Sequence, residues 1–410
     1  MSLAEAQRLD AQDPLASCIA QFEIPQGLIY LDGNSLGPLT SGAKQRAMDV
    51  VNTQWGQDLI TSWNKHQWIE LPARVGAKVA DIIGAAADEV ICCDSTSVNL
   101  FKLLSAALKL RPNRTRIVSE KGNFPTDLYM AQGLRALLGE HIELHLVERE
   151  DILASLDNDV AVVMLTQVDF RSGHMLDIQQ VSEACHQVGA LTLWDLAHSA
   201  GAVPLSLSEW NVDFAVGCGY KYLNGGPGAP AFAYVAKRLQ SDIQQPLSGW
   251  MGHANPFAFA VDYTPAAGIN SLLCGTPAVL SMSVLDAALD VFAGLHMADI
   301  RDKSLLLSEH FLQWVDEDPA CSALQLISPR APEQRGSQLA YRHPQAYALC
   351  QALIADGVVA DFRAPDILRL GLAPLYLRFS DLWRAKTVLA DILTKHTYLD
   401  AKFQQRQKVT

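Results

Sequence analysis

Residues 193–231, LWDLAHSAGAVPLSLSEWNVDFAVGCGYKYLNGGPGAPA, decide the fold. Three short apolar runs lie within this stretch or overlap its ends, at 190–194, 213–217 and 231–235. Continuous apolar runs of this length are typical of strands that are buried on both faces of a sheet. Toward the N-terminus, a fourth apolar run at 159–166 is followed by helix-like spacing at 179–188. The alternation predicts an α/β protein whose mostly parallel sheet is covered by helices.

Beyond residue 276 the pattern changes to helices mixed with short strand-like runs. Helical spacing covers 277–293, 300–315, 344–355 and 381–396, and strand-like runs cover 324–327, 338–342 and 367–372. This mixture predicts a smaller α+β domain. We therefore place a large domain at 41–275 and a small C-terminal domain at 276–410, with the N-terminal segment 1–40 packing near the small domain.

Composition narrows the classes of function. The 410 residues are 49% hydrophobic and 19% charged, which excludes a disordered polar chain. The net charge of −12 argues against a general nucleic-acid-binding protein. No apolar run approaches the ~18–20 residues that cross a bilayer, and the first residues lack a signal-peptide pattern. Eight cysteines without CxxC spacing predict reduced thiols in a cytoplasmic protein. From the charge and the short apolar runs, we expect neither nucleic acid nor a membrane as a partner.

Asp195 and Lys221 carry the predicted chemistry of the opening stretch. Asp195 ends a predicted strand, at the edge of an open parallel sheet that faces ligands. Lys221 follows the next strand and precedes three glycines, at 225, 226 and 228, which let the backbone approach a bound group. A lysine amine can condense with the aldehyde of pyridoxal 5′-phosphate (PLP), and a carboxylate can keep its pyridine nitrogen protonated. Taken singly, Asp195 is equally explained as a helix cap and Lys221 as a surface lysine.

PLP also needs a phosphate site, and residues 94–97 (DSTS) precede a helical run at 98–108. Hydroxyl groups and free N–H groups at the start of a helix bind anions without a basic residue. The same residues would also be expected if 94–97 only capped the helix and bound no anion. The competing dinucleotide fingerprint lacks its third glycine at 217–222 (GCGYKY), and no GxxxxGK[ST] loop is present. The pattern therefore favours PLP over a nicotinamide cofactor.

Seven motifs together resemble the kynureninases, which are PLP-dependent enzymes of fold type I. The motifs are YLDGNSLGPL (30–39), NFPTD (123–127), FRSGHMLDI (170–178), WDLAHSAG (194–201), GCGYKYLNGGPG (217–228), GWMGH (249–253) and LRLGLAPLY (368–376). The combination of YKYLNGGPG, GWMGH and GNSLG is more specific than DxAH or YK, which related families share. The resemblance implies PLP as cofactor, a homodimer with shared active sites, and hydrolysis of L-kynurenine to anthranilate and L-alanine in tryptophan catabolism.

The resemblance also assigns roles to residues. Lys221, Tyr220 and Asp195 would be catalytic, with Lys221 holding the cofactor and Tyr220 either donating a proton or only binding phosphate. The cofactor-binding residues it implies are Thr96, Ser97, Phe124, Asp127, Thr166, Asp195, His198, Tyr220, Lys221 and, from the neighbouring subunit, Trp250 and Thr276. Arg369 would bind the substrate carboxylate, Trp63 would stack on its aromatic ring, and Ser35 would contact it from a turn.

Two positions bear on the choice of substrate. Family members that prefer 3-hydroxykynurenine tend to have histidine where Trp63 aligns and Ser-Asn where this chain has Gly275-Thr276. The resemblance therefore implies a preference for unsubstituted kynurenine, although Trp63 is equally explained as a core aromatic. We expect no metal site, since His141 and His145 lack a third ligand in pattern.

Two other functions remain open. Another PLP enzyme of the same fold, such as a cysteine desulfurase or lyase, needs a reactive cysteine on a mobile C-terminal loop. Cys321 and Cys350 are the candidates, and neither lies in a glycine-rich loop. A non-catalytic binding protein on the same fold predicts loss of the lysine, whereas Lys221 is present with its whole neighbourhood.

Overall fold

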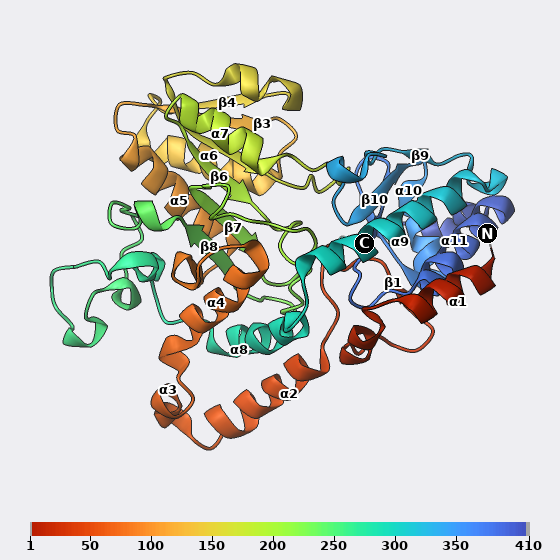
Figure 1. Ribbon diagram of the computed structural model, residues 1–410, viewed down its shortest axis with the longest axis horizontal. Coiled ribbons are helices and arrows are strands. Elements are labelled where there is room, and N and C mark those ends of the chain that lie inside the picture. Colours follow the sequence, from red (N-terminus) through yellow and green to blue (C-terminus); the bar gives the residue numbers. More distant parts are fainter. Residues whose placement is uncertain (1, 407–410) are drawn as a thin grey trace.

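The chain forms two lobes, seen in a computed structural model that describes residues 2–406 (Figure 1). The first lobe is built on a seven-stranded sheet with the order β2-β8-β7-β6-β5-β3-β4. Its strands are β2 (Val90–Cys92), β3 (Arg116–Glu120), β4 (Glu143–Val147), β5 (Val160–Thr166), β6 (Leu191–Asp195), β7 (Phe214–Cys218) and β8 (Ala231–Val235). Strands β3 to β7 run parallel, and β8 is antiparallel to β7 and β2. The mostly parallel sheet is confirmed.

Helices cover both faces of this sheet. Alternate residues of β5 belong to two separate apolar clusters, with Val163 in one and Val162 in the other. The first cluster includes residues of α4 (Leu71–Ile83) and α7 (Ile178–Gln187), and the second includes residues of α5 (Thr96–Leu110) and α6 (Pro125–Leu138). Because successive side chains of a strand point to opposite faces, both faces of β5 are buried. This burial explains why the sequence of β5 is a continuous apolar run.

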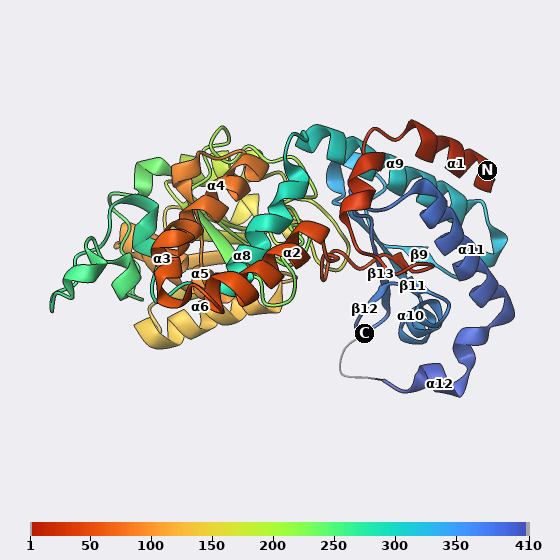
Figure 2. The same ribbon diagram turned by 90° about the horizontal axis from the view of Figure 1, so that it is seen from below.

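The second lobe contains a four-stranded antiparallel sheet with the order β12-β13-β10-β9. The strands are β9 (Gln325–Leu326), β10 (Gln338–Arg342), β12 (Asp361–Arg363) and β13 (Ile367–Gly371), and the main helices are α9 (Met297–Asp316), α10 (Ala346–Ala355) and α11 (Phe379–Lys395). Figure 2 shows α9 and α11 on one side of these strands and α10 on the other. A short helix, α12 (Ala401–Gln404), follows α11 near the C-terminal end of the described residues.

The N-terminal segment packs on the second lobe. Helix α1 (Leu3–Gln12) lies beside α11, where the Phe379 N–H donates to Asp10 Oδ1 over 2.7 Å (Figure 2). Strand β1 (Ile29–Tyr30) pairs in parallel with β11 (Val358–Val359). A buried ion pair joins Lys303 Nζ to Asp13 Oδ2 at 2.7 Å. The two ends of the chain thus build one lobe together.

Helix α8 (Val279–Ala288) packs against α4 and α2 (Ser41–Asp49), both on the first lobe. The expected helix 277–293 is shorter than its pattern, since α8 gives way to a 3-10 turn at Leu289–Phe292 and Gly294 follows with a φ of +74°. The chain crosses to the second lobe near Gly294. The division into domains at 275/276 stays a prediction. Among the described residues, no single helix is long and apolar enough to span a membrane, and only the pair Val279–Phe292 and Met297–Asp316, bent by 80°, would meet that requirement together.

Candidate active site

The predicted site residues of the first lobe meet at the carboxyl ends of its central strands. Thr166 ends β5 and is the register partner of Asp195, which ends β6. Lys221 follows β7, while Phe124 and Asp127 lie at the start of α6. Parallel strands end at one edge of a sheet, so the topology brings these distant segments together.

Lys221 lies beside a buried imidazole. Its Nζ is 2.9 Å from His198 Nε2 and 6.0 Å from the centroid of the Phe124 ring. Burial lowers the pKa of the lysine amine, and the charges of Arg369 and Arg363 lower it further. Burial, followed by the charge of Lys221, also lowers the pKa of His198. Both shifts favour the neutral forms, and a neutral amine is the nucleophile that Schiff-base chemistry requires.

The backbone around Lys221 is held by close packing. Gly225 N donates to Gly219 O over 2.8 Å, closing the glycine-rich turn. Gly37, the last glycine of the GNSLG motif, donates its N–H to Tyr220 O over 2.7 Å, and a side chain at Gly37 would collide with Lys221 O. The N-terminal motif therefore closes directly over the lysine.

Two buried carboxyl groups, those of Asp195 and Asp127, lie near the lysine. Asp195 is 3% exposed and accepts a hydrogen bond from Ala197 N at 2.7 Å. Asp127 is 1% exposed, and its Oδ1 has no hydrogen-bond partner among the described residues. Burial raises the pKa of both groups, and the charge of Asp195 raises that of Asp127 further. A cation placed between them would stabilise their ionised forms.

Asn123 was not among the predicted site residues, although it begins the NFPTD motif. Thr166 Oγ1 lies 2.5 Å from Asn123 Oδ1 and 3.2 Å from Asp127 Oδ2. The amide thus helps to fix the hydroxyl beside the buried carboxyl group. The sequence signal for Asn123 was its place as a polar residue between the end of a strand and the start of a helix.

Thr96 and Ser97 lie in the first turn of α5, which begins two residues earlier than the predicted helical run at 98–108. Ser95 caps this helix, since its Oγ accepts a hydrogen bond from Val98 N at 3.3 Å. Asp94 precedes the cap with a left-handed φ of +48°. Its carboxylate pairs with the buried Lys102, whose Nζ also donates to Leu272 O over 2.5 Å. The free N–H groups and hydroxyls of this turn form a suitable anion site.

Tyr220 keeps its proton in this setting. The nearby Cys218 and burial raise the pKa of the Tyr220 phenol, which leaves the hydroxyl protonated at neutral pH. A protonated phenol can donate a hydrogen bond to a phosphate oxygen or a proton to a substrate atom. The structure is therefore compatible with both roles considered for Tyr220.

The second lobe contributes a compact arginine cluster. Arg369 in β13 is completely buried and ion-pairs with the Asp361 carboxylate. Its Nη2 also donates to Ser35 Oγ over 2.7 Å, so two predicted substrate residues do lie together. Arg363 Nη2 lies 2.9 Å from Asp361 Oδ2 and 3.2 Å from Ser35 Oγ. Asp361 and Arg363 were not predicted, and the signal was the β12–β13 hairpin, whose register pairs Asp361 with Arg369.

Phe170 connects the lysine region with the arginine cluster. Its ring lies edge-on to that of Phe124, with centroids 5.1 Å apart. Its backbone carbonyl accepts a hydrogen bond from Arg369 Nη1 at 2.6 Å. One residue thus contacts both ends of the candidate site.

Three predicted residues lie elsewhere in this single chain. Trp63, in α3 (Ser62–Lys65), packs edge-on to Trp68 at 5.8 Å, at the outer side of the first lobe (Figure 1). Trp250 contacts Phe257 at 5.8 Å and lies next to the exposed segment of Thr276, since Met251 N donates to Cys274 O over 3.0 Å. Among the described residues, no hydrogen bond or ring contact joins these three residues to Lys221 or Arg369.

The groups around Lys221 fit PLP. The Lys221 amine, whose pKa is lowered, suits the aldehyde of PLP, the buried carboxyl groups of Asp195 and Asp127 suit its cationic pyridine ring, and the start of α5 suits its phosphate. The solved structure of C-DES with glycine covalently linked to its PLP cofactor superimposes with a TM-score of 0.78, covering 90% of this chain and 98% of that chain at 16% identity. Fold and site together define a PLP-dependent enzyme of fold type I.

Sequence relatives narrow this class. Residues 300–389 match the family described as the kynureninase C-terminal domain. The kynureninase of Burkholderia mallei (strain SAVP1) is 50% identical over 411 residues, which cover 99% of each chain. That of Pseudomonas fluorescens is 47% identical over 407 residues, or 98% of each chain. The chain belongs to the kynureninase family.

Proposed function

We propose that this protein uses PLP to hydrolyse the Cβ–Cγ bond of L-kynurenine, giving anthranilate and L-alanine. The observation that carries the proposal is the link, through Phe170, between the buried amine of Lys221 and the buried fork of Arg369. An amino-acid substrate with a carboxylate at one end would lie across both. The full-length relatives bear the name of this enzyme.

The reaction needs proton transfers that the residues near Lys221 can provide. When bound, PLP supplies an electron sink for charge that develops on the substrate Cα. The Lys221 amine, whose pKa is lowered by burial, would take the Cα proton, and the ionised carboxylate of Asp195 would hold the pyridine nitrogen in its protonated form. Water adds to the Cγ carbonyl and its oxygen leaves in the carboxylate of anthranilate. Tyr220 then donates a proton to the carbon that becomes the methyl group of alanine.

The family resemblance suggests the other contacts to cofactor and substrate, and the positions of these residues support them. Phe124 would stack on the pyridine ring, with Asp127, Thr166 and His198 around it. Thr96 and Ser97 bind the phosphate at the start of α5. Arg369 binds the substrate carboxylate, and the Ser35 hydroxyl contacts it from the second lobe.

We also propose a homodimer in which Trp250, Thr276 and Trp63 complete the partner's site, with Trp63 favouring unsubstituted kynurenine. The support is the projecting segment 247–264 (Figure 1), where Phe257 is 61% exposed and Phe259 is 77% exposed. A patch of large apolar side chains on one segment is typical of a surface that another chain covers. We propose that a second copy of this chain covers the segment, because the predicted site residues Trp63 and Trp250 would then contact the active site of that copy. The eight free thiols support a cytoplasmic location.

A cysteine desulfurase or lyase is the alternative on this fold, and C-DES is named as a cystine C–S lyase. Its likeness to this chain, at 16% identity, shows the fold alone. The two candidate cysteines, Cys321 and Cys350, are both buried in the second lobe, where neither can serve as a mobile nucleophile. The buried positions of both cysteines favour the kynurenine reaction.

The proposal is tested by incubating the purified protein with PLP and L-kynurenine while following the fluorescence of anthranilate. We expect anthranilate and alanine in equal amounts. A parallel sample with L-cystine tests the lyase alternative. Protein that binds PLP yet forms no anthranilate would contradict the kynurenine reaction and leave the PLP enzyme class intact.

A further inference from the structure

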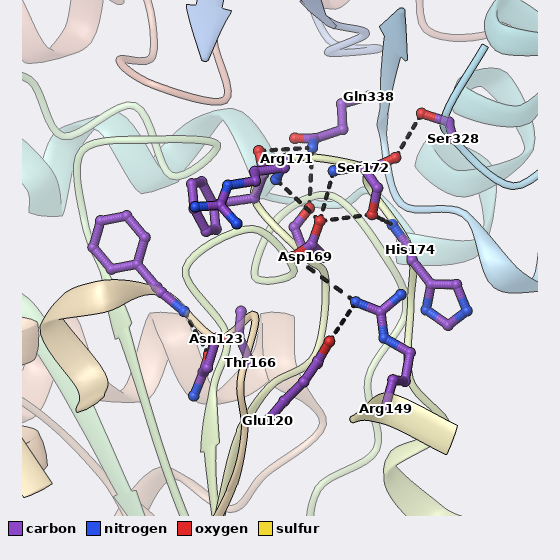
Figure 3. Close-up of polar contacts among 12 residues, drawn as sticks. Glu120, Asn123, Arg149, Thr166, Asp169, Arg171, Ser172, His174, Ser328 and Gln338 are labelled. Carbon is purple, nitrogen blue, oxygen red and sulfur yellow. Dashed lines mark hydrogen bonds and ion pairs between the residues drawn. The ribbon is translucent and has the colours of Figure 1, made fainter. Parts of the chain in front are cut away.

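The turn at residues 169–174 (DFRSGH), called here the lobe-linking turn, lies in the chain between β5 and α7. A bridge between Val168 and Met175 closes its base. The turn belongs to the first lobe by sequence, yet it contacts strand β10 and the segment before it in the second lobe (Figure 3). It is therefore placed to set how the two lobes face each other.

Besides the bond from Arg369 to the Phe170 carbonyl, four hydrogen bonds fasten the turn to the second lobe. Ser328 Oγ donates to Ser172 O over 2.6 Å, and Gly336 N donates to Gly173 O over 2.8 Å. Gln338 Nε2 lies 3.2 Å from Asp169 O and 3.3 Å from Phe170 O. Gly173 has a left-handed φ of +73° and packs against the Gln338 side chain, where a larger residue would collide. The backbone of the turn is thus fixed from the side of the second lobe.

Asp169 fixes the same turn from within (Figure 3). Its Oδ1 accepts hydrogen bonds from Ser172 N and Ser172 Oγ, both at 2.6 Å, and from Arg171 N at 3.1 Å. Its Oδ2 lies 3.9 Å from Arg149 Nη2, and that nitrogen donates to Glu120 Oε1 over 2.8 Å. The carboxylate therefore holds the turn closed and connects it to the edge of the main sheet.

The part of the turn that reaches the active site is Phe170. Its carbonyl is one of the acceptors that orient Arg369, at 2.6 Å from Nη1. The other nitrogen, Nη2, is engaged by Ser35 and Asp361, so the Phe170 carbonyl fixes the plane of the guanidinium. A planar fork binds a carboxylate well only in the right orientation, and small misplacements reduce binding strongly.

We propose that Asp169 is a positioning residue for recognition of the substrate α-carboxylate. It acts through the lobe-linking turn, whose Phe170 carbonyl aims Arg369. The inference rests on the proposed function, because it takes L-kynurenine as the substrate. It places specificity for amino acids partly in a side chain that touches neither substrate nor cofactor.

The test compares Asp169→Ala and Asp169→Asn with Asp177→Ala in the PLP-loaded enzyme. Asp177 is the matched control because it caps α7 in the same segment, accepting from Gln180 N at 2.9 Å, and makes no contact with Phe170 in the structure. We expect Asp169→Ala to raise the KM for L-kynurenine about tenfold with kcat little changed. Asparagine keeps an acceptor for the turn, so Asp169→Asn should stay close to wild type, as should Asp177→Ala.

A second ligand separates carboxylate recognition from general damage. The amine obtained by removing the α-carboxylate of kynurenine is measured as a competitive inhibitor, and Asp169→Ala should leave its inhibition constant unchanged. An equal loss for both ligands, an unchanged KM in Asp169→Ala, or an Asp169→Asn variant as impaired as Asp169→Ala would overturn the inference. If Asp169→Ala does not fold, Ser172→Ala removes one of the same hydrogen bonds and should raise KM by about threefold. Wild-type enzyme that forms no anthranilate would refute the proposed function instead.

Discussion

Buried ionisable groups have different surroundings in the lysine region, made of Lys221, His198, Asp195 and Asp127, and in the arginine cluster of the second lobe. In the lysine region, burial lowers the pKa of Lys221 and raises those of Asp195 and Asp127, and one carboxylate oxygen has no partner among the described residues. In the arginine cluster, Arg369 is equally buried but has a carboxylate, a hydroxyl and a carbonyl as partners. The first region is incomplete without a cationic ligand, whereas the second is already ordered by its own side chains.

This difference predicts different responses to ligands. A cofactor that supplies the missing charges should stabilise the fold strongly, because it binds only the folded state. A preorganised arginine fork should instead determine substrate affinity with little rearrangement. Variants at Lys221, Arg369, Lys102 and Asp32 can test this contrast.

Removing the lysine should abolish the reaction. Lys221→Ala should reduce kcat by at least about 10³-fold, because it removes both the covalent attachment of PLP and the base at the substrate Cα. Visible absorbance of the bound cofactor and anthranilate fluorescence measure the two losses. The exposed Lys237→Ala is the control, with an ion pair to Asp88 as its main contact. Normal turnover by Lys221→Ala would show that the lysine assignment is wrong.

Removing the buried guanidinium should affect substrate affinity and stability together. Arg369→Met should raise the KM for L-kynurenine by about 10²-fold, since a fully desolvated charge pair loses one member. The free energy of unfolding should fall by about 3–5 kcal/mol, because the buried Asp361 loses a buried counter-charge. Steady-state kinetics and urea unfolding measure the two effects. Arg363→Met, at a half-buried site, should have smaller effects of both kinds, and an unchanged KM in Arg369→Met would contradict the assignment.

The turn before α5 should depend on Lys102. Lys102→Met should weaken PLP binding about tenfold, because the Asp94 carboxylate is left uncompensated close to the proposed phosphate site and Leu272 O loses its donor. Titration of apoenzyme with PLP measures the change. The double variant Asp94→Asn/Lys102→Met removes the uncompensated charge and should recover part of the affinity. Identical PLP affinity in wild type and Lys102→Met would exclude a role for this lysine at the phosphate.

Asp32 should give the smallest effect, and it depends on pH. Burial and the charge of Asp361 raise the pKa of Asp32 from 3.8 to about 6. The folded state therefore holds this proton more tightly than the unfolded state, and stability falls as pH rises through about 6. Asp32→Asn should be more stable than wild type by about 1–2 kcal/mol at pH 8, allowing for partial exposure of the side chain. Thermal unfolding at pH 8 and pH 4 measures the difference, which should disappear at the lower pH.

The lysine region could be predicted from sequence because its residues lie at the ends of strands that short stretches of sequence identify. Strands β6, β7 and β8 lie within one residue of their apolar runs, since burial on both faces leaves no polar alternation. Asp195 ends one such strand and Lys221 lies shortly after another, so the parallel topology alone places them at one edge. The family, the fold and PLP as cofactor are confirmed, and the roles of individual residues stay predictions.

The arginine cluster could be predicted only in part, because its contacts depend on pairing between distant segments. Arg369 was found through its motif, but its partner Asp361 lies on the three-residue strand β12, and the pairing follows from antiparallel register. Gln338 contacts the lobe-linking turn across more than 160 residues of chain. Helix α8 ended early for a related reason, since the crossing between lobes, not the apolar spacing, determines where the chain turns.

The covalent attachment of the cofactor tests the central claim most directly. Holoenzyme is reduced with borohydride, digested, and its peptides are analysed by mass spectrometry. We expect a pyridoxyl phosphate adduct on the peptide that contains Lys221, and its loss from the same peptide when the cofactor is removed before reduction. An adduct confined to another lysine, in enzyme that still forms anthranilate, would contradict it.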